Sequence, residues 1–241
     1  MQASSIELVI ALYQFVILIF SLSVHECAHA WVAQRLGDAT GRLEGRISLN
    51  PTRHIDLIGT LIYPALMIFG PLIGFGGGGI VCGWGKPVPV LTRNLKHITR
   101  DDNLISVAGP LANVLLAMVS IFVLVIVILV VPGERDAVGG LMMGQISLGE
   151  SSAPQALAML FWLMIEVNLA LFFFNFLPIA PLDASRIVRN LLPYNALNTF
   201  DTIGRFGFIV IFIIGRFVVH LFLGPAMAVV GAFLSVFLQI R

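Results

Sequence analysis

Long uninterrupted apolar runs dominate this chain and limit what it can fold into. Each run is long enough for the roughly 20 residues that a helix needs to cross a lipid bilayer. A chain with 58% hydrophobic and 11% charged residues, and a mean hydropathy of +0.97, cannot surround a core with a solvated surface. We therefore expect an α-helical polytopic membrane protein with about five transmembrane helices. The runs cover residues 6–34, 104–131, 156–177, 203–222 and 224–240.

A further apolar stretch, at residues 57–75, is interrupted by proline and glycine. Pro64, Gly70 and Pro71 break it, and four consecutive glycines follow. Such a composition is typical of a re-entrant or interfacial element and not of a full span. The next segment, residues 83–90 ("GWGKPVPV"), is short and rich in proline, which predicts a short β-hairpin with an edge strand.

Charge and cysteine content exclude several classes of function. Lys plus Arg number 14 and Asp plus Glu number 13, so the chain offers no basic face for nucleic acid. Cys27 and Cys82 lack the CxxC spacing of a metal site and cannot build a disulfide framework. The first apolar run lacks a basic leader and a small-residue cleavage site, so we expect a retained helix and not a signal peptide.

The distribution of Lys and Arg orients the spans, because cytoplasmic loops collect these residues. Unlike the basic loops named below, the loop at 132–152 contains only one arginine, together with three acidic residues. We expect the basic loops on the cytoplasmic side, with the N-terminus outside and the C-terminal Arg241 inside. The basic loops are those at 35–54, 86–100 and 183–205.

The first apolar run contains three ionisable side chains, His25, Glu26 and His29, in the sequence "HECAHA". Residues i and i+4 share one face of a helix, so the two histidines can hold one metal ion while Glu26 flanks its open position. The alternative is a pair of hydrogen-bonded core histidines, but ionisable groups inside a membrane helix usually serve a function. The pattern predicts a zinc site, with Cys27 facing away as a packing residue.

A zinc hydrolase needs a third protein ligand. The strongest candidate follows the apolar run at 156–177, where Pro178 and Pro181 interrupt the helix and place Asp183 at the start of a new one. Irregular backbone at membrane depth is tolerated where it lines a wet cavity. On these residues alone, the simpler alternative is that Asp183 caps the helix that follows.

Five segments, in order, resemble the motifs of the site-2 proteases, intramembrane zinc metalloproteases that cut substrate helices within the bilayer. The resemblance covers residues from about 20 to 192 and is carried by "HECAHA", "NPTRHIDLIGT", "GWGKPVPV", "AGPLAN" and "FNFLPIAPLD". It implies that one Zn²⁺ per chain is bound by His25, His29 and Asp183. It also implies that Glu26 activates water and that Asn175 stabilises the oxyanion.

The resemblance implies a single metalloprotease domain over residues 1–241, with a core at about 6–192 and accessory helices at about 200–241. The implied partners are the lipid bilayer and membrane-protein substrates with a single spanning helix, which residues 83–90 could bind as an added strand. We expect an integral protein of a bacterial or archaeal-type cell membrane, with the active site opening toward the cytoplasm. No oligomeric state is indicated.

Several alternatives remain open. Ala184 stands where the family has glycine, which would matter if the backbone there needed a positive φ, and it suggests an inactive homologue that binds substrates. A zinc or cation transporter would use the same ligands for transport. A membrane zincin of the prenyl-protein-processing type would take Glu166 as its third ligand.

Other polar residues have weaker functional interpretations. His54 could contact the site or serve as a structural hydrogen-bonding group. Asn113 is expected to pack between helices with one interhelical hydrogen bond. Arg216 and His220 could form an ion path, although inward pairing or an interfacial position is the simpler interpretation.

Overall fold

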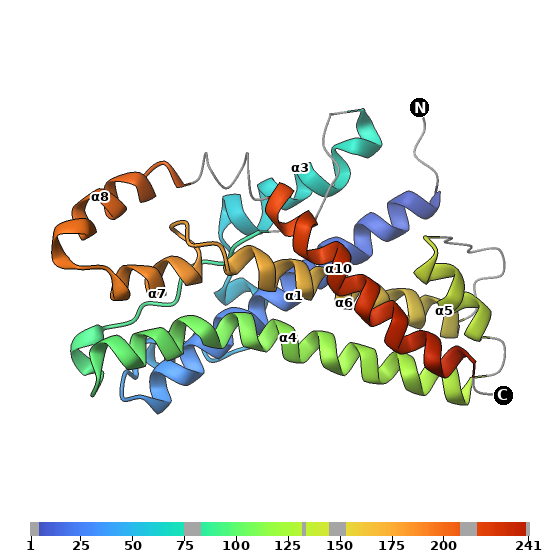
Figure 1. Ribbon diagram of the computed structural model, residues 1–241, viewed down its shortest axis with the longest axis horizontal. Helices are drawn as coiled ribbons and strands as arrows, with labels where there is room; N and C mark the ends of the chain where they lie inside the picture. Colours follow the sequence, from blue (N-terminus) through green and yellow to red (C-terminus); the bar gives the residue numbers. More distant parts are fainter. Residues whose placement is uncertain (1–4, 75–82, 132–133, 145–152, 208–215, 240–241) are drawn as a thin grey trace.

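The computed structural model describes residues 5–74, 83–131, 134–144, 153–207 and 216–239. Four of its helices are long and apolar enough to cross a membrane. They lie alongside one another and define the long axis of the molecule (Figure 1). The chain is therefore a mostly helical integral membrane protein. The four helices are α1 (Ser5–Arg35), α4 (Ile98–Val130), α6 (Ala153–Asn175) and α10 (Arg216–Leu238).

Helix α6 lies at the centre of the bundle, and α10 lies at its edge. Half of the apolar stretch of α6 is buried, against 17% of that of α10. The main core is aliphatic and includes Leu18 of α1, Leu124 of α4 and Leu171 of α6, all fully buried. On the outside, large apolar side chains such as Leu115 and Phe122 of α4 are exposed. An outer surface of this kind suits contact with lipid and not with water.

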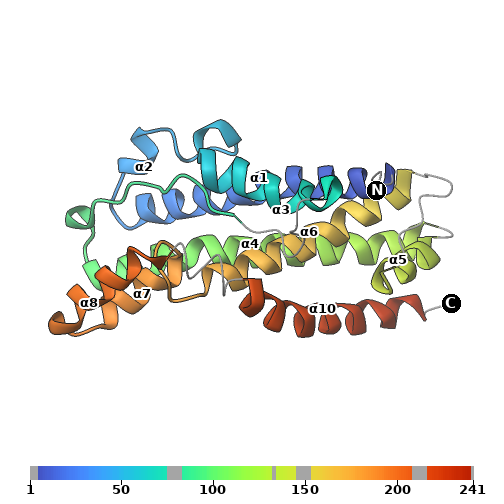
Figure 2. The ribbon, with the colours of Figure 1, turned by 90° about the horizontal axis from the view of Figure 1, so that it is seen from above.

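Shorter elements gather at the two ends of the bundle (Figures 1 and 2). Helices α2, α7 and α8 lie at one end, and α5 lies at the other end together with both chain termini. The shorter elements are α2 (Thr40–Leu43), η1 (Pro51–Arg53), η2 (Leu57–Ile62), α3 (Tyr63–Phe69), η3 (Pro71–Ile73), η4 (Thr92–Asn94), α5 (Glu134–Met142), α7 (Asp183–Leu191) and α8 (Tyr194–Gly204).

The chain that follows the interrupted stretch at 57–75, from residue 83 on, lies beside the start of that stretch. The apolar helix of the stretch, Leu57–Phe69, is shorter than a membrane span. The Trp84 amide donates to the Gly59 carbonyl at 3.2 Å, and the Thr60 hydroxyl donates to the Trp84 carbonyl at 2.9 Å. Because the chain after this stretch pairs with its beginning, the described part of it fits the expected re-entrant element.

The two early basic loops lie together, as the charge distribution predicts. Both oxygens of Asp38 are used: Oδ2 accepts from the Leu91 amide at 2.8 Å, and Oδ1 accepts from Asn94 Nδ2 at 2.8 Å. Burial raises the pKa of the Asp38 carboxyl, but these hydrogen bonds and those from Thr40 lower it overall. Arg46 Nη1 also donates to the Lys86 carbonyl at 3.4 Å. The loops at 35–54 and 86–100 therefore share one side.

The predicted division of the C-terminal part into two spans is wrong. Helix α10 continues through Gly224 and Pro225, where the apolar pattern suggested a boundary. Proline is tolerated inside membrane helices because neighbouring groups satisfy the carbonyl that it leaves free. Residues 208–215 of the predicted span at 203–222 lie outside the described residues. The described chain thus holds four candidate spans and not five.

This change reverses the expected position of the C-terminal end. Leu238 at the end of α10 lies near Gly139 of α5, since a Cβ added at that glycine would stand 3.9 Å from Leu238 Cδ1. Helix α10 therefore ends on the side of α5 and of the N-terminus (Figure 1), and not on the side of α7 and α8. This position agrees with the four candidate spans found in the described residues.

The predicted β-hairpin is unconfirmed. Within the described residues no strand is present, and residues 83–91 run as extended chain without a ladder. Pro87 and Pro89 carry no N–H group, so this segment cannot donate at alternate positions. Residues 75–82, which precede this segment, lie outside the described part.

Candidate metal centre

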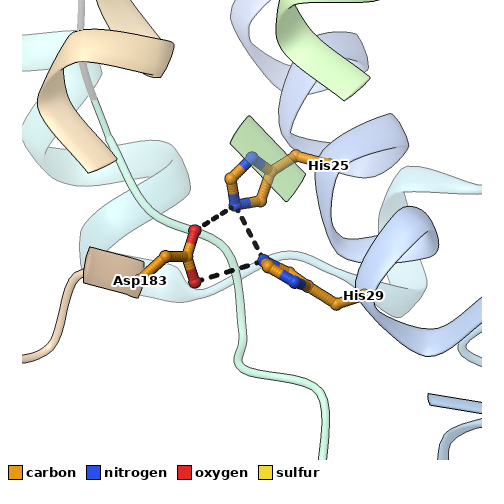
Figure 3. Close-up of side chains that lie close together, drawn as sticks. All are labelled: His25, His29 and Asp183. Atoms are coloured by element: carbon orange, nitrogen blue, oxygen red, sulfur yellow. Dashed lines mark hydrogen bonds and ion pairs between the residues drawn. The ribbon is translucent and has the colours of Figure 1, made fainter. Parts of the chain in front are cut away.

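His25 and His29 lie on one face of α1, one turn apart, as their spacing predicts. Both are buried, with 3% and 5% of their surfaces exposed. Their Nε2 atoms stand 3.1 Å apart. Figure 3 shows the two rings directing these nitrogens toward a common point. The two side chains are therefore arranged to share one ligand.

Asp183 reaches the same point from the beginning of α7. Its Oδ2 lies 3.0 Å from His25 Nε2, and its Oδ1 lies 3.2 Å from His29 Nε2 (Figure 3). Leu182 occupies the N-cap position, and no side chain caps the helix. The capping alternative for Asp183 is therefore wrong. Burial raises the pKa of its carboxyl, but the two adjacent histidines lower it overall, which favours the carboxylate.

Two interactions on α7 hold Asp183 in place. Arg186, one turn further along, forms a salt bridge with Asp102 of α4. Asn190 Nδ2 donates to the other Asp102 oxygen at 2.8 Å. Helix α7, which carries Asp183 in its first turn, is thus tied along its length to the beginning of α4.

Helix α4 supports both histidines from behind. His29 Nδ1 donates to the Ile105 carbonyl at 2.6 Å, which leaves Nε2 as the free acceptor nitrogen. Gly109 faces both rings: a Cβ there would stand 2.4 Å from His29 Nε2 and 2.5 Å from His25 Nε2. Neither residue was predicted from the sequence as part of the site. The glycine in "AGPLAN" was the available signal, since glycine marks close approach.

Glu26 lies beside the histidines on the wall of a small cavity. It is 7% exposed, and Gly85 of the extended segment packs directly against its side chain. A Cβ at Gly85 would stand 2.8 Å from Glu26 Oε1. The cavity, of about 100 Å³, is lined by the three candidate ligands, Glu26, Trp84, Gly85, Pro87, Val88, Val90, Asn175, Pro181, Arg186 and two leucines.

Asn175 ends α6 and lines the same cavity. Its Nδ2 donates to the Leu171 carbonyl one turn earlier, at 3.0 Å. A primary amide has two N–H groups, so one remains for a group in the cavity. The structure thus brings all five predicted site residues together.

Ala184 does not strain the backbone. It lies in the first turn of α7, and none of the described non-glycine residues has a positive φ. Alanine is compatible with a helical conformation, so the replacement of glycine leaves Asp183 in place. The reason to suspect an inactive homologue is removed.

The other sequence candidates lie outside the cluster of potential ligands. Within the described residues, that cluster contains His25, His29 and Asp183 and neither Glu166 nor Cys27. His54 is also separate: it is buried, and its Nε2 donates to the Ser48 carbonyl at 2.7 Å. Burial lowers the pKa of His54, which favours the neutral ring and its structural role. His220 is exposed, and the side chain of Arg216 lies outside the described part.

The three side chains fit a zinc ion. Two imidazole nitrogens and a carboxylate, with ligand atoms all within 4.8 Å of one another, form a donor set that zinc prefers in hydrolases. Gly109 lets both Nε2 atoms come close to the backbone of α4, where a Cβ would collide with them. Glu26 is adjacent but remains outside the donor set, as expected of a base.

Comparison with known proteins gives consistent results. Residues 13–214 match the sequence model of a family described as Peptidase family M50. "Putative zinc metalloprotease YwhC" of Bacillus subtilis (strain 168) is 34% identical over 202 residues, which are 84% of this chain and 79% of that protein.

A second relative matches over a shorter region. "Putative zinc metalloprotease Rip2" of Mycolicibacterium smegmatis (strain ATCC 700084 / mc(2)155) is 33% identical over 100 residues, which are 42% of this chain and 35% of that protein. No solved structure matches the chain.

Proposed function

The chain belongs to peptidase family M50, the site-2 protease family, and is an intramembrane zinc metallopeptidase; on this premise we propose which residues carry the reaction. His25, His29 and Asp183 bind the zinc ion, Glu26 is the general base and acid, and Asn175 stabilises the oxyanion. The substrates are single-span membrane proteins, cut within the bilayer.

One observation carries this proposal. Asp183 is 154 residues from His29 in the chain (183 − 29), yet its carboxylate bridges both histidine Nε2 atoms at 3.0 and 3.2 Å. Buried histidines and a carboxylate without a ligand between them would cost stability in a membrane bundle. A metal ion coordinated by all three groups would offset this cost.

The chemistry follows from the side chains around the cavity. When bound, zinc acts as a Lewis acid that activates a water molecule and polarises the substrate carbonyl. Glu26 accepts the proton of the attacking water and delivers it to the amide nitrogen as the carbon–nitrogen bond breaks. The free N–H of Asn175 donates to the oxygen on which negative charge develops. The products are a carboxyl and an amine terminus.

The extended segment at 83–90 is suited to hold an unwound substrate. Gly85, Pro87, Val88 and Val90 line the cavity beside Glu26. Within the described residues, the backbone N–H groups of Gly85, Val88 and Val90 have no hydrogen-bond partner. In an extended chain the N–H groups of Val88 and Val90 point to one edge and that of Gly85 points to the other. An added substrate strand could pair with Val88 and Val90 and present a peptide bond to the metal.

The site opens toward the end of the bundle that carries the basic loops. Arg35 ends α1 about ten residues after His25, roughly 15 Å along the helix. If the loops rich in Lys and Arg are cytoplasmic, then water reaches the site from the cytoplasm.

The first prediction tests the assigned roles. In purified protein, His25→Ala, His29→Ala and Asp183→Ala should each lose most of the single zinc ion per chain, because three ligands are needed for tight binding. Glu26→Gln should retain zinc but lower cleavage of a membrane-embedded substrate at least roughly 10²-fold, since it removes the proton acceptor. Zinc content and turnover are measured on the same preparations.

Glu166→Gln is the matched control, because this residue lies in a membrane helix outside the ligand cluster. It should keep both zinc and activity. Full zinc in Asp183→Ala, or equal cleavage by wild type and Glu26→Gln, would contradict the assignment. Metal flux through the wild type without cleavage would favour the transporter.

A further inference from the structure

Helix α4 meets the histidines of α1 at regular intervals. Ile105 accepts a hydrogen bond from His29 Nδ1, and Gly109 contacts both rings. The two helices run in opposite directions (Figure 1), and Ile105 belongs to the same small buried cluster as Ala33, near the end of α1. The next residue on this face of α4, Asn113, therefore lies one turn beyond Gly109, on the His25 side.

The two histidines differ in what holds their second nitrogen. Nδ1 of His29 donates to the Ile105 carbonyl, whereas Nδ1 of His25 is buried and has no hydrogen-bond partner among the described residues. Metal-binding histidines almost always donate this second N–H to a fixed acceptor. His25 needs an acceptor on the side away from Asp183.

Asn113 is fully buried, and neither atom of its amide has a partner within the described chain. An amide in this position costs stability unless its hydrogen bonds are made. Asn168 on α6 also has a buried atom without a partner among the described residues, its Oδ1. The Nδ2 atom of Asn168 donates to Ser21 Oγ at 2.9 Å, and Ser21 lies one turn before His25 on α1.

These unpaired atoms complement one another as donors and acceptors. His25 Nδ1 and Asn113 Nδ2 can donate, whereas the Oδ1 atoms of Asn113 and Asn168 can accept. Helix α4 packs against both α1 and α6, so hydrogen bonds, made directly or through a buried water, could join these groups in a single series. The series would run from His25 through Asn113 and Asn168 to Ser21.

We propose that Asn113 is a positioning residue for the metal centre: its Oδ1 accepts the Nδ1 hydrogen of His25, and its Nδ2 donates to Asn168 Oδ1. Ile105 performs the corresponding task for His29. The inference rests on the proposed metal-binding role of His25. This hydrogen bond keeps His25 in the tautomer and ring orientation that present Nε2 to the metal.

The test measures metal binding in the intact protein. Asn113→Leu has a similar volume but cannot accept a hydrogen bond, so zinc affinity by chelator competition should fall about 10- to 100-fold, as for other residues that support metal ligands. Asn113→Asp retains the acceptor and should restore affinity to within about threefold of the wild type. The absorption spectrum of the Co²⁺-loaded protein should change in Asn113→Leu and not in Asn113→Asp.

Ser120→Ala is the matched control, because Ser120 is another buried polar residue of α4, and its hydroxyl donates to Leu116 within the same helix. It should leave both metal affinity and the Co²⁺ spectrum unchanged. The Tm of the metal-free variants reports folding, and Asn113→Ala replaces Asn113→Leu if the latter is not recovered folded.

The outcomes separate this inference from the proposed function. If the wild type binds no zinc, or binds it without His25, the proposed function fails and the inference fails with it. If zinc binding needs His25 but Asn113→Leu and the wild type bind it equally, Asn113 is a packing residue. Equal losses in Asn113→Leu and Asn113→Asp would also overturn the proposal, because the acceptor would then be irrelevant.

Discussion

Gly109 is the residue whose absent side chain allows the metal centre to form. Glycine inside a helix costs about 0.5–1 kcal/mol relative to alanine, so its presence in α4 needs a reason. The reason is steric: the Nε2 atoms of His25 and His29 occupy the space that a Cβ would take. The Ile105 carbonyl, which accepts the Nδ1 hydrogen of His29, then orients the His29 ring beside Gly109.

The residue-scale prediction is that Gly109→Ala abolishes metal binding. The added Cβ would stand 2.4–2.5 Å from both histidine nitrogens, well inside van der Waals contact, so the rings must move. Zinc content should fall well below half an ion per chain, or zinc affinity by about 100-fold, the upper end of the loss seen when residues that support metal ligands are changed. Elemental analysis of the purified protein measures the zinc content, and chelator competition measures the affinity.

Gly231→Ala in α10 provides the comparison, because a Cβ there would meet Met142 Cε at an ordinary 3.5 Å. This variant should keep its zinc. Normal zinc content in Gly109→Ala would mean that the histidines do not bind the metal through Nε2.

Among the elements, the extended segment at 83–90 joins the scaffold to the site. One side of it is tied to the re-entrant element: Trp84 and Lys86 donate to the carbonyls of Gly59 and His54, at 3.2 and 2.7 Å. Trp84, Gly85, Pro87, Val88 and Val90 line the cavity. The N–H groups of Val88 and Val90 continue the edge that Trp84 and Lys86 begin, and they are unpaired among the described residues, so an added strand could extend this edge.

The element-scale prediction compares Val88→Pro with Val88→Ala. Both remove packing against Gly41, but only proline removes the unpaired N–H of residue 88. If a substrate strand accepts a hydrogen bond from this group, turnover should fall roughly tenfold further in Val88→Pro, the loss of a hydrogen bond worth about 1.5 kcal/mol. Zinc content should be equal in the two variants.

The readout is cleavage of a membrane-embedded helical substrate by both variants under the same conditions. Equal turnover would show that the N–H of residue 88 does not contact the substrate, and the segment would then be scaffold. A loss of zinc in Val88→Pro would point instead to displacement of Glu26 and its neighbours.

At the scale of the whole molecule, the number of spans decides which ends share a side. Four candidate spans place the end of α10 beside α5 (Figure 2), whereas five would place it beside α7 and α8. The basic loops, joined by Asp38 and Arg46, lie at the opposite end of the bundle. The molecule therefore has a basic end, near the metal centre, and an end that holds both termini.

The whole-molecule prediction uses cysteine labelling in a background where Cys27 and Cys82 are replaced by serine. Single cysteines at Glu44, Arg93, Met143 and Gln239, all exposed positions, report the side of each segment. The first two should react with a membrane-impermeant reagent from the cytoplasm, because they lie in the basic loops. The last two should react from the opposite side.

Each result has a distinct meaning. Reaction at 44 and 93 from opposite sides would make the stretch at 57–75 a full span. Reaction at 239 from the same side as 44 would restore a fifth span.

The sequence by itself determined the features that depend on neighbouring residues. Apolar runs longer than a bilayer crossing identify membrane helices, and the four-residue spacing of His25 and His29 places both on one helix face whatever the rest of the chain does. The prolines in the stretch at 57–75 likewise favoured an element that does not cross, and its described apolar helix, Leu57–Phe69, is shorter than a membrane span.

The tertiary structure decided what depends on distant contacts. Asp183 reads equally well as a helix cap until α7 is tied to α4 by Arg186 and Asp102 and its carboxylate meets the histidines. Gly109 comes close to the rings of His25 and His29 only because α4 packs against α1.

The C-terminal helix shows the same limit for the fold. Gly224 and Pro225 are local helix-breaking signals, but α10 continues through them because a membrane bundle can satisfy the freed backbone group. Local patterns act within a few residues of the chain, whereas these outcomes depend on the free energy of packing between segments far apart in the sequence, which no local pattern records.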